Sequence, residues 1–202
     1  MEVNMKFEKI ILPVLMGLLI LAGCEKKVAA ETETVPAENT EIAASVVKSS
    51  LFGAPIKFST IDLDGNKQNE SIFKKADITM INVWATWCGP CRGELPEIGE
   101  VAKSIKSKNG QVISIIHDAH MNMDDVKERQ VLVKNMLNDA NCDYVTLVNN
   151  TSFDPIFQDI QGFPTTFFVD KDGNIIGEPL LGGRNKAQFE AAFEAALKKI
   201  KK

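Results

Sequence analysis

The sequence predicts an α/β sandwich in which a central mixed β-sheet is flanked by helices. Apolar segments of strand length alternate with segments of helical periodicity between residues 79 and 148. A further strand–turn–strand pattern and a final amphipathic segment follow. Strands that alternate with helices, and then a hairpin and a helix, are typical of such a layered fold.

A β-hairpin is expected before the first of these strands. Its two strands are Ile56–Ile61 and Ser71–Phe73, and they flank the turn sequence Asp64-Gly65-Asn66. The aspartates also suggest a calcium-binding loop, but the glycine does not stand where an EF-hand requires it. The sequence therefore favours a turn.

A buried strand and a long helix are predicted next. The strand is Thr79–Trp84, and the helix after it is expected to be kinked by Pro96 and to end at Gly110. Apolar side chains at helical spacing mark its inward face. They are Leu95, Ile98, Val101, Ala102 and Ile105.

The middle of the domain is predicted to contain two more strands, Val112–Ile116 and Tyr144–Val148, with a helix between them. The apolar face of that helix comprises Val126, Val133, Met136, Leu137 and Ala140.

The C-terminal part is expected to form a hairpin and a helix. Thr165–Val169 and Asn174–Ile176 should pair across the turn at 171–173, and Asn185 with Gln188 forms a capping box that opens the helix. The inward face of this helix is predicted to be Phe189, Phe193, Ala196, Leu197 and Ile200.

The motif Cys88-Gly89-Pro90-Cys91 follows directly on the strand Thr79–Trp84. Two residues between the sulfurs allow the first turn of a helix to bring them within bonding range, and the helix N-terminus places partial positive charge beside the first sulfur. Cys88 is therefore expected to ionise readily and to act as the nucleophile in disulfide exchange. An inert structural disulfide is the alternative. Half of a zinc site is disfavoured, because the chain has no second Cys or His pair at ligand spacing.

Three segments carry a resemblance to a known family. Trp84–Arg92 resembles the active-site strand and turn of thioredoxin-fold proteins, and Gly162–Phe167 resembles their cis-proline loop. Arg-Gly-Glu-Leu-Pro at 92–96 resembles the membrane-tethered branch that includes TlpA and ResA. The resemblance extends over residues 52–202. It implies a thioredoxin-like three-layer sandwich with an extra N-terminal hairpin and a central helical insertion.

The resemblance and the thiol chemistry together divide the roles in the site. Cys88 is expected to attack a substrate disulfide, and Cys91 to resolve the mixed disulfide that forms. The resemblance implies a cis peptide bond before Pro164, a substrate-binding surface around the dithiol, and neither a cofactor nor a metal ion. The residues expected at that surface are Trp87, Gly89, Pro90, Phe163, Pro164 and Thr165.

Glu94 is the expected proton acceptor for Cys91. It lies three residues further along the same helix, within reach directly or through water. Thioredoxins commonly have an Asp beneath the dithiol where this chain has Asn82, so proton handling should pass to Glu94. Partial burial would raise the pKa of Glu94 toward the working range. The alternative is a solvated helix charge.

The N-terminus predicts export and lipid attachment. Lys6 and Lys9 precede the apolar run Ile10–Leu21, which is short for a membrane-spanning helix. The run ends in Leu-Ala-Gly-Cys, which resembles a bacterial lipobox. Cys24 would then be the first residue of the mature chain and carry the lipid. An ordinary signal peptide with an incidental cysteine is the alternative.

We therefore expect a lipoprotein signal peptide at 1–23, a flexible tether at 24–50 and a thioredoxin-like domain at 51–202. This organisation places the domain on the extracytoplasmic face of the cell membrane, attached by its lipid anchor. The net charge of −4 argues against nucleic acid as a partner.

Three residues that could react or bind a metal ion remain outside this site. Cys142 is expected to be a small buried hydrophobe, with a regulatory thiol as the alternative. His117 and His120 follow the strand Val112–Ile116, at the sheet edge where the dithiol should lie. Two cysteines and a distant His could carry copper, but such carriers of this fold resemble a wider Cys-x-x-x-Cys spacing. Loop histidines are therefore favoured.

The resemblance favours thiol–disulfide reduction outside the cytoplasm. Oxidised exported proteins, of the apocytochrome c or methionine sulfoxide reductase kind, are the expected substrates, and a membrane thiol carrier of the CcdA or DsbD kind is the expected electron donor. A disulfide oxidase or isomerase and a copper carrier are the alternatives. A peroxidase is disfavoured, because the dithiol lacks the Pro-x-x-x-Thr-x-x-Cys context of peroxiredoxins.

Overall fold

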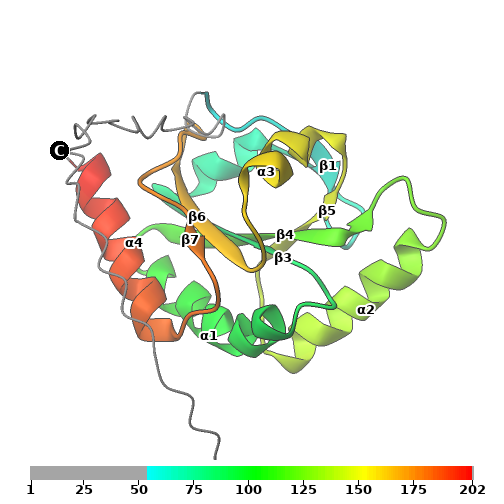
Figure 1. The fold of residues 1–202 in the computed structure, drawn as a ribbon. Coiled ribbons are helices and arrows are strands. Elements are labelled where there is room, and N and C mark those ends of the chain that lie inside the picture. Colours follow the sequence, from blue (N-terminus) through cyan, green and yellow to red (C-terminus); the bar gives the residue numbers. More distant parts are fainter. Residues whose placement is uncertain (1–53, 202) are drawn as a thin grey trace, which may run out of the picture. The chain divides into compact units, whose positions relative to one another are not determined.

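The computed structural model describes residues 54–201 (Figure 1). At their centre lies a five-stranded sheet with the strand order β5-β4-β3-β6-β7. The strands are β3 (Ile78–Trp84), β4 (Gly110–His120), β5 (Val145–Asn149), β6 (Thr165–Asp170) and β7 (Leu180–Leu181). β3 runs parallel to β4 and antiparallel to β6, so the predicted α/β sandwich with a mixed sheet is confirmed. The predicted signal peptide, lipid anchor Cys24 and tether lie outside the described residues.

Helices cover both faces of this sheet (Figure 1). One face carries α1 (Gly89–Lys106), α2 (Val126–Asp139) and α4 (Lys186–Ile200). The opposite face carries α3 (Asp154–Asp159) and the 3-10 helices η2 (Glu70–Lys75) and η3 (Thr151–Phe153). Within residues 54–201, no helix combines the length and the apolar character needed to cross a membrane.

The central strand β3 is buried along its whole length, and its side chains alternate between the two faces. Ile81 and Val83 belong to the core beneath η2 and α3. Ile78 and Met80 belong to the core beneath α1 and α4, which includes Phe189. Packing on both faces of the sheet therefore fixes the end of β3, from which the next residues of the chain start.

The N-terminal hairpin is confirmed, but its second strand is displaced. β1 (Ser59–Ile61) pairs antiparallel with β2 (Lys67–Asn69), and Gly65 in the turn has a φ of 85°. The predicted second strand, Ser71–Phe73, lies in η2 instead. The Asn69 side chain accepts a hydrogen bond from a backbone N–H of η2, and this cap favours the helical turn.

Two predicted helix features are wrong. Helix α1 ends at Lys106, and Gly110 begins β4 instead of closing the helix. A Cβ at Gly110 would lie 2.5 Å from the ring of Phe193, so the glycine makes room for packing. The capping box of α4 is confirmed, but Ile200 is 37% exposed because it occupies the last turn.

The sequence patterns missed α3 and β7, which have six and two residues and are too short for periodicity to mark them. Asn174–Ile176 forms only a bridge from Ile175 to Val169, while β7 provides the neighbour of β6. β4 is also longer than predicted.

Candidate active site

The two cysteines lie where β3 gives way to α1, and they form a disulfide. Cys88 is the N-cap of α1, and its Sγ accepts a hydrogen bond from the Cys91 backbone N–H at 3.2 Å. Pro90 suits the first turn, because its missing N–H would have no helical partner there. The first-turn amides therefore favour a thiolate on Cys88 when the disulfide is reduced.

Both cysteines are shielded by the protein. Cys88 is 5% exposed and Cys91 is 1% exposed, and they pack with Trp84 and Leu137. Apart from its chain neighbours and the backbone of α1, nothing lies within 4 Å of the position that a Cβ on Gly89 would take. The surface beside Gly89 is therefore open to a docking partner.

The loop that carries Cys88 is tied to β4. The backbone N–H of Thr86 donates to Asp118 Oδ1 at 2.9 Å, and the Thr86 hydroxyl donates to Asp118 Oδ2. Arg129 of α2 holds the same carboxylate at 3.4 Å. β4 and α2 together therefore fix the position of the loop.

Exposed Trp87 and half-buried Phe163 form the apolar border of the site, and Pro164 after them is buried. Trp87 is 63% exposed, and its ring packs against that of Phe163 in a T-shaped arrangement with centroids 5.8 Å apart. The peptide bond between Phe163 and Pro164 is cis, as the resemblance implied. Thr165 is buried, and its hydroxyl donates to the Gly162 carbonyl at 2.7 Å. Its side chain holds the loop, so Thr165 could meet a substrate only through its backbone.

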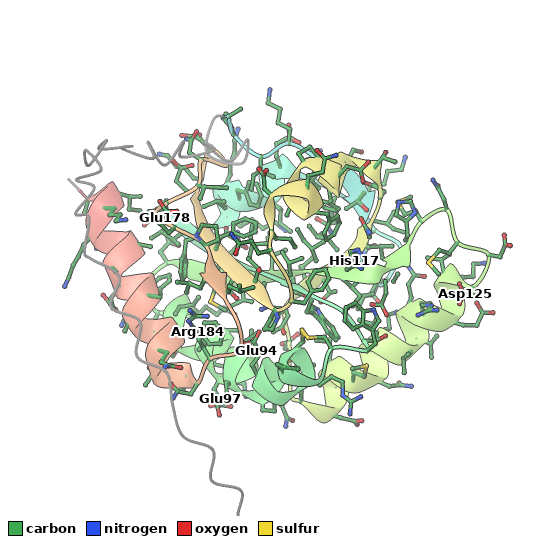
Figure 2. All side chains as sticks on the ribbon, viewed as in Figure 1. Glu94, Glu97, His117, Asp125, Glu178 and Arg184 are labelled. Carbon is green, nitrogen blue, oxygen red and sulfur yellow. A yellow bond between two sulfur atoms is a disulfide. The ribbon has the colours of Figure 1, made fainter. Side chains whose placement is uncertain are left out.

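Glu94 is buried, which contradicts the alternative of a solvated helix charge. The residue is 3% exposed. Its Oε1 accepts a hydrogen bond from the Asn82 side chain at 2.8 Å, and its Oε2 accepts one from the Arg184 backbone N–H at 3.0 Å. Figure 2 shows Glu94 on α1 next to Arg184, in the segment before α4.

The pKa of Glu94 is raised to about 7, because burial outweighs the two hydrogen bonds and the Arg184 charge, all of which lower it. A carboxyl group that titrates near neutral pH can both take and return a proton there.

The sequence did not predict Thr166 or Arg184 as members of this network. The hydroxyl of Thr166 on β6 accepts a hydrogen bond from Asn82 at 3.0 Å. Arg184 lies in the segment after β7, and its backbone N–H donates to Glu94. Neither Thr166 nor Arg184 carries a local signal, because each reaches the site only through the tertiary fold.

Cys142 is half-buried, and its thiol donates to the Leu95 carbonyl at 3.1 Å. Burial raises the pKa of this thiol, so it is a poor nucleophile. This environment agrees with the expected packing role.

His117 and His120 lie within β4, so their assignment to a loop is wrong. The His117 ring packs between Phe157 and Phe163, with centroids 4.8 and 4.9 Å away. In the part of the chain that the structure describes, no three His, Cys, Asp or Glu side chains are grouped as a metal ion would require.

A disulfide at the start of a helix, a neighbouring cis-proline and a buried carboxyl group on this fold define a thioredoxin-fold thiol–disulfide oxidoreductase. More specifically, the model of the AhpC/TSA family matches residues 53–177, and the chain belongs to that family.

Known proteins resemble this chain in sequence and in fold. Thiol-disulfide oxidoreductase ResA of Bacillus thuringiensis (strain Al Hakam) is 28% identical over 133 residues, which cover 66% of this chain and 70% of that protein. A thiol:disulfide interchange protein of Chlorobium tepidum TLS has a TM-score of 0.56 at 28% identity, covering 71% of this chain and 94% of that one. The pneumococcal exposed lipoprotein thioredoxin of Streptococcus pneumoniae, at 21% identity, shares the fold, with a TM-score of 0.55 and coverage of 69% and 98%.

Proposed function

We propose that this protein reduces disulfides of exported proteins on the extracytoplasmic face of the cell membrane, where lipidated Cys24 and the tether 24–50 hold the domain 51–202. The observation that carries this proposal is the buried carboxyl group of Glu94, three residues beyond Cys91, with a pKa of about 7. A resolving thiol must lose its proton before it can attack, and a base that titrates near neutral pH suits that step.

The reaction starts from the reduced dithiol. The Cys88 thiolate attacks one sulfur of the substrate disulfide, and the other substrate sulfur leaves as a thiolate. Glu94 accepts the proton of Cys91, whose thiolate then attacks the Cys88 sulfur of the mixed disulfide. The first substrate thiolate takes a proton from water and the second takes the proton held by Glu94, so the substrate leaves with two thiols and the protein keeps the Cys88–Cys91 disulfide.

Each turnover therefore takes two electrons from the dithiol of the protein. A membrane thiol carrier of the CcdA or DsbD kind returns them by the same exchange chemistry, run in the opposite direction on the Cys88–Cys91 disulfide. The substrates are exported proteins of the apocytochrome c or methionine sulfoxide reductase kind.

The substrate segment lies along the apolar border described above. Trp87 and Phe163 offer apolar ring surface, and Pro164 is buried behind Phe163 in the same loop. The open side of Gly89 and the exposed Pro90 leave room for the approach. The buried side chain of Thr165 stabilises that loop through its hydrogen bond to the Gly162 carbonyl.

A disulfide oxidase is the second candidate, and the reduction potential separates the two. Thioredoxin lies near about −270 mV and the oxidant DsbA near about −120 mV. A potential of the Cys88–Cys91 pair at the reducing end supports the proposal, whereas a value at the oxidising end would replace it with an oxidase.

A covalent trap identifies the substrate. Cys91→Ser combined with Cys142→Ala leaves Cys88 as the only cysteine in residues 54–201, so mixed disulfides formed at Cys88 should persist. Non-reducing separation and mass spectrometry of membrane extracts should show partners that are missing with Cys88→Ser. A trap that captures nothing beyond this control would contradict the proposal.

A further inference from the structure

The segment 181–184, which connects β7 to α4, supplies one of the two hydrogen bonds that Glu94 accepts within residues 54–201. The donor is the backbone N–H of Arg184, at 3.0 Å from Glu94 Oε2. The mechanism proposed above gives no task to the Arg184 side chain. The contacts of that side chain therefore call for a separate account.

Side-chain packing holds this segment only weakly. Two of its four residues are Gly182 and Gly183, and Leu181 is 50% exposed. Apart from chain neighbours, nothing lies within 4 Å of the position that a Cβ on Gly182 would take, and nothing within 3.5 Å of that on Gly183. A pocket of about 460 Å³ borders the segment, with Glu94, Gly183 and Arg184 in its wall. Hydrogen bonds must therefore fix the place of the segment.

The guanidinium group of Arg184 makes two of these bonds. Its Nη1 donates to the Leu181 carbonyl at 2.9 Å and to the Gly182 carbonyl at 2.6 Å. The side chain thus folds back over its own segment and ties the end of the segment to its start. Hydrogen bonds from a charged donor are stronger than those between neutral groups. The guanidinium therefore restrains the peptide group whose N–H binds Glu94.

The start of the segment is bound to the loop of the cis-proline. The Gly182 backbone N–H donates to the Pro164 carbonyl at 2.8 Å, and Leu181 pairs with Thr165 between β7 and β6. Gly182 has a φ of 86°, a conformation that glycine adopts without steric cost. The segment is thus anchored at the proline loop, and the Arg184 side chain carries that anchoring to the bond with Glu94.

Other charged and titratable groups adjoin Glu94 and bear on its ionisation. They are Cys91 and Glu97 on α1, Tyr144 before β5, and Arg184. Burial raises the pKa of Tyr144, so this residue stays neutral. The positive charge of Arg184 lowers the pKa of Glu94. Arg184 could thus act through its charge or through the position of its backbone, and a test has to separate the two.

We infer that Arg184 is a positioning residue for the resolution step: its guanidinium group, bound to two carbonyls of the segment 181–184, keeps the Arg184 backbone N–H on the carboxyl group of Glu94. This inference rests on the proposed function, in which Glu94 is the base. Displacement of the segment would leave Asn82 as the donor to Glu94. The charged form of Glu94 would then be less stable, and Glu94 would keep its proton to higher pH.

Two variants should displace the segment in different ways. Arg184→Met removes the guanidinium, whereas Gly182→Ala keeps the Arg184 charge but strains the backbone at a φ of 86°. In both, the pH inflection of mixed-disulfide resolution should rise by about 0.5 to 1 unit, the equivalent of one hydrogen bond. Resolution at about pH 6 should therefore slow by about three- to tenfold, while the rate at about pH 9 should stay close to that of the parent. Stopped-flow reduction of a model disulfide measures both rates.

Two matched controls separate positioning from charge and from strain. Lys186→Met removes a positive charge two residues beyond Arg184, where the Lys186 side chain binds Glu190 and no carbonyl of the segment. Gly65→Ala introduces the same kind of strain at a φ of 85°, in the turn of the N-terminal hairpin. Neither control should move the inflection. Thermal unfolding verifies that the variants fold, and Arg184→Met and Gly182→Ala each give an answer where the other does not fold.

The possible results distinguish this inference from the proposed function. A shift with Arg184→Met alone would mean that the charge acts and would overturn the positioning role. Equal shifts in all four variants would mean a general loss of stability and would overturn it as well. A parent protein that reduces disulfides with an inflection that neither segment variant moves would overturn only this inference. A parent protein that reduces no disulfide would overturn the proposed function itself.

Discussion

The side-chain amide of Asn82 donates a hydrogen bond to the carboxyl group of Glu94 at 2.8 Å, across the contact between β3 and α1. Burial raises the pKa of Glu94, and the hydrogen bond from Asn82 opposes that rise. The pair thus sets the pH at which the buried carboxyl group changes its charge. Four expected outcomes follow from this pair and from the N-terminal sequence.

Replacement of Glu94 should slow the resolution of the mixed disulfide. Glu94→Gln keeps the shape but cannot accept a proton, and loss of a general base costs about 10²-fold or more. In the parent protein, resolution should accelerate as the pH rises through about 7, where Glu94 loses its proton. The variant should lack this inflection, while the attack by Cys88 stays unchanged. Stopped-flow reduction of a model disulfide separates the two steps, and equal resolution rates from pH 6 to 9 would refute the role.

Asn82 should determine the pH at which Glu94 ionises. Asn82→Ala removes a hydrogen bond that lowers the pKa of Glu94, so the inflection should move to higher pH by about 0.5 to 1 unit, the equivalent of one hydrogen bond. Thr166→Val is the matched control, because it removes the other partner of the Asn82 amide and leaves the bond to Glu94. A pH profile that moves equally in both variants would show a general packing effect instead.

Glu94 should also make stability depend on pH. Its pKa rises from 4.5 in the unfolded chain to about 7 in the fold. The folded carboxyl group therefore holds a proton that the unfolded chain has lost. Its stabilisation is complete below pH 4.5 and is lost as the pH rises to 7, which corresponds to about 3 kcal/mol.

Urea unfolding of the parent and of Glu94→Gln measures this effect. The variant cannot ionise, so its free energy of unfolding relative to the parent should rise by up to about 3 kcal/mol between pH 4.5 and pH 7. A difference that stays constant over this range would mean that Glu94 titrates alike in the folded and unfolded chains.

The N-terminal sequence predicts a lipidated mature chain. Intact-mass measurement on membrane-extracted protein should find a chain that begins at Cys24 and carries the added mass of its lipid. Protease should cleave the tether before about residue 50 and release the domain, because the sequence there has few large apolar side chains to bury. Cys24→Ser protein should leave the membrane fraction, and its retention there would contradict the anchor.

Much of the fold was predictable because its signals are local. The alternation of apolar segments marked β3, α1, α2 and α4 and most of β4 to β6, and the capping box placed the start of α4. Short elements such as α3 and β7 carry no periodicity, so only packing against the sheet reveals them. The prediction that Gly110 ends helix α1 was wrong because it, too, depended on packing. The glycine leaves room for the ring of Phe193, which is distant in the sequence.

The sequence by itself determined the reactive pair, because Cys88 and Cys91 need only the first turn of one helix to meet. The spacing from Cys91 to Glu94 is likewise a property of a single helix. Tertiary structure alone decided what that carboxyl group can do. Asn82 on β3 and Arg184 after β7 both donate to the Glu94 carboxyl group, and burial between these elements raises its pKa to about 7.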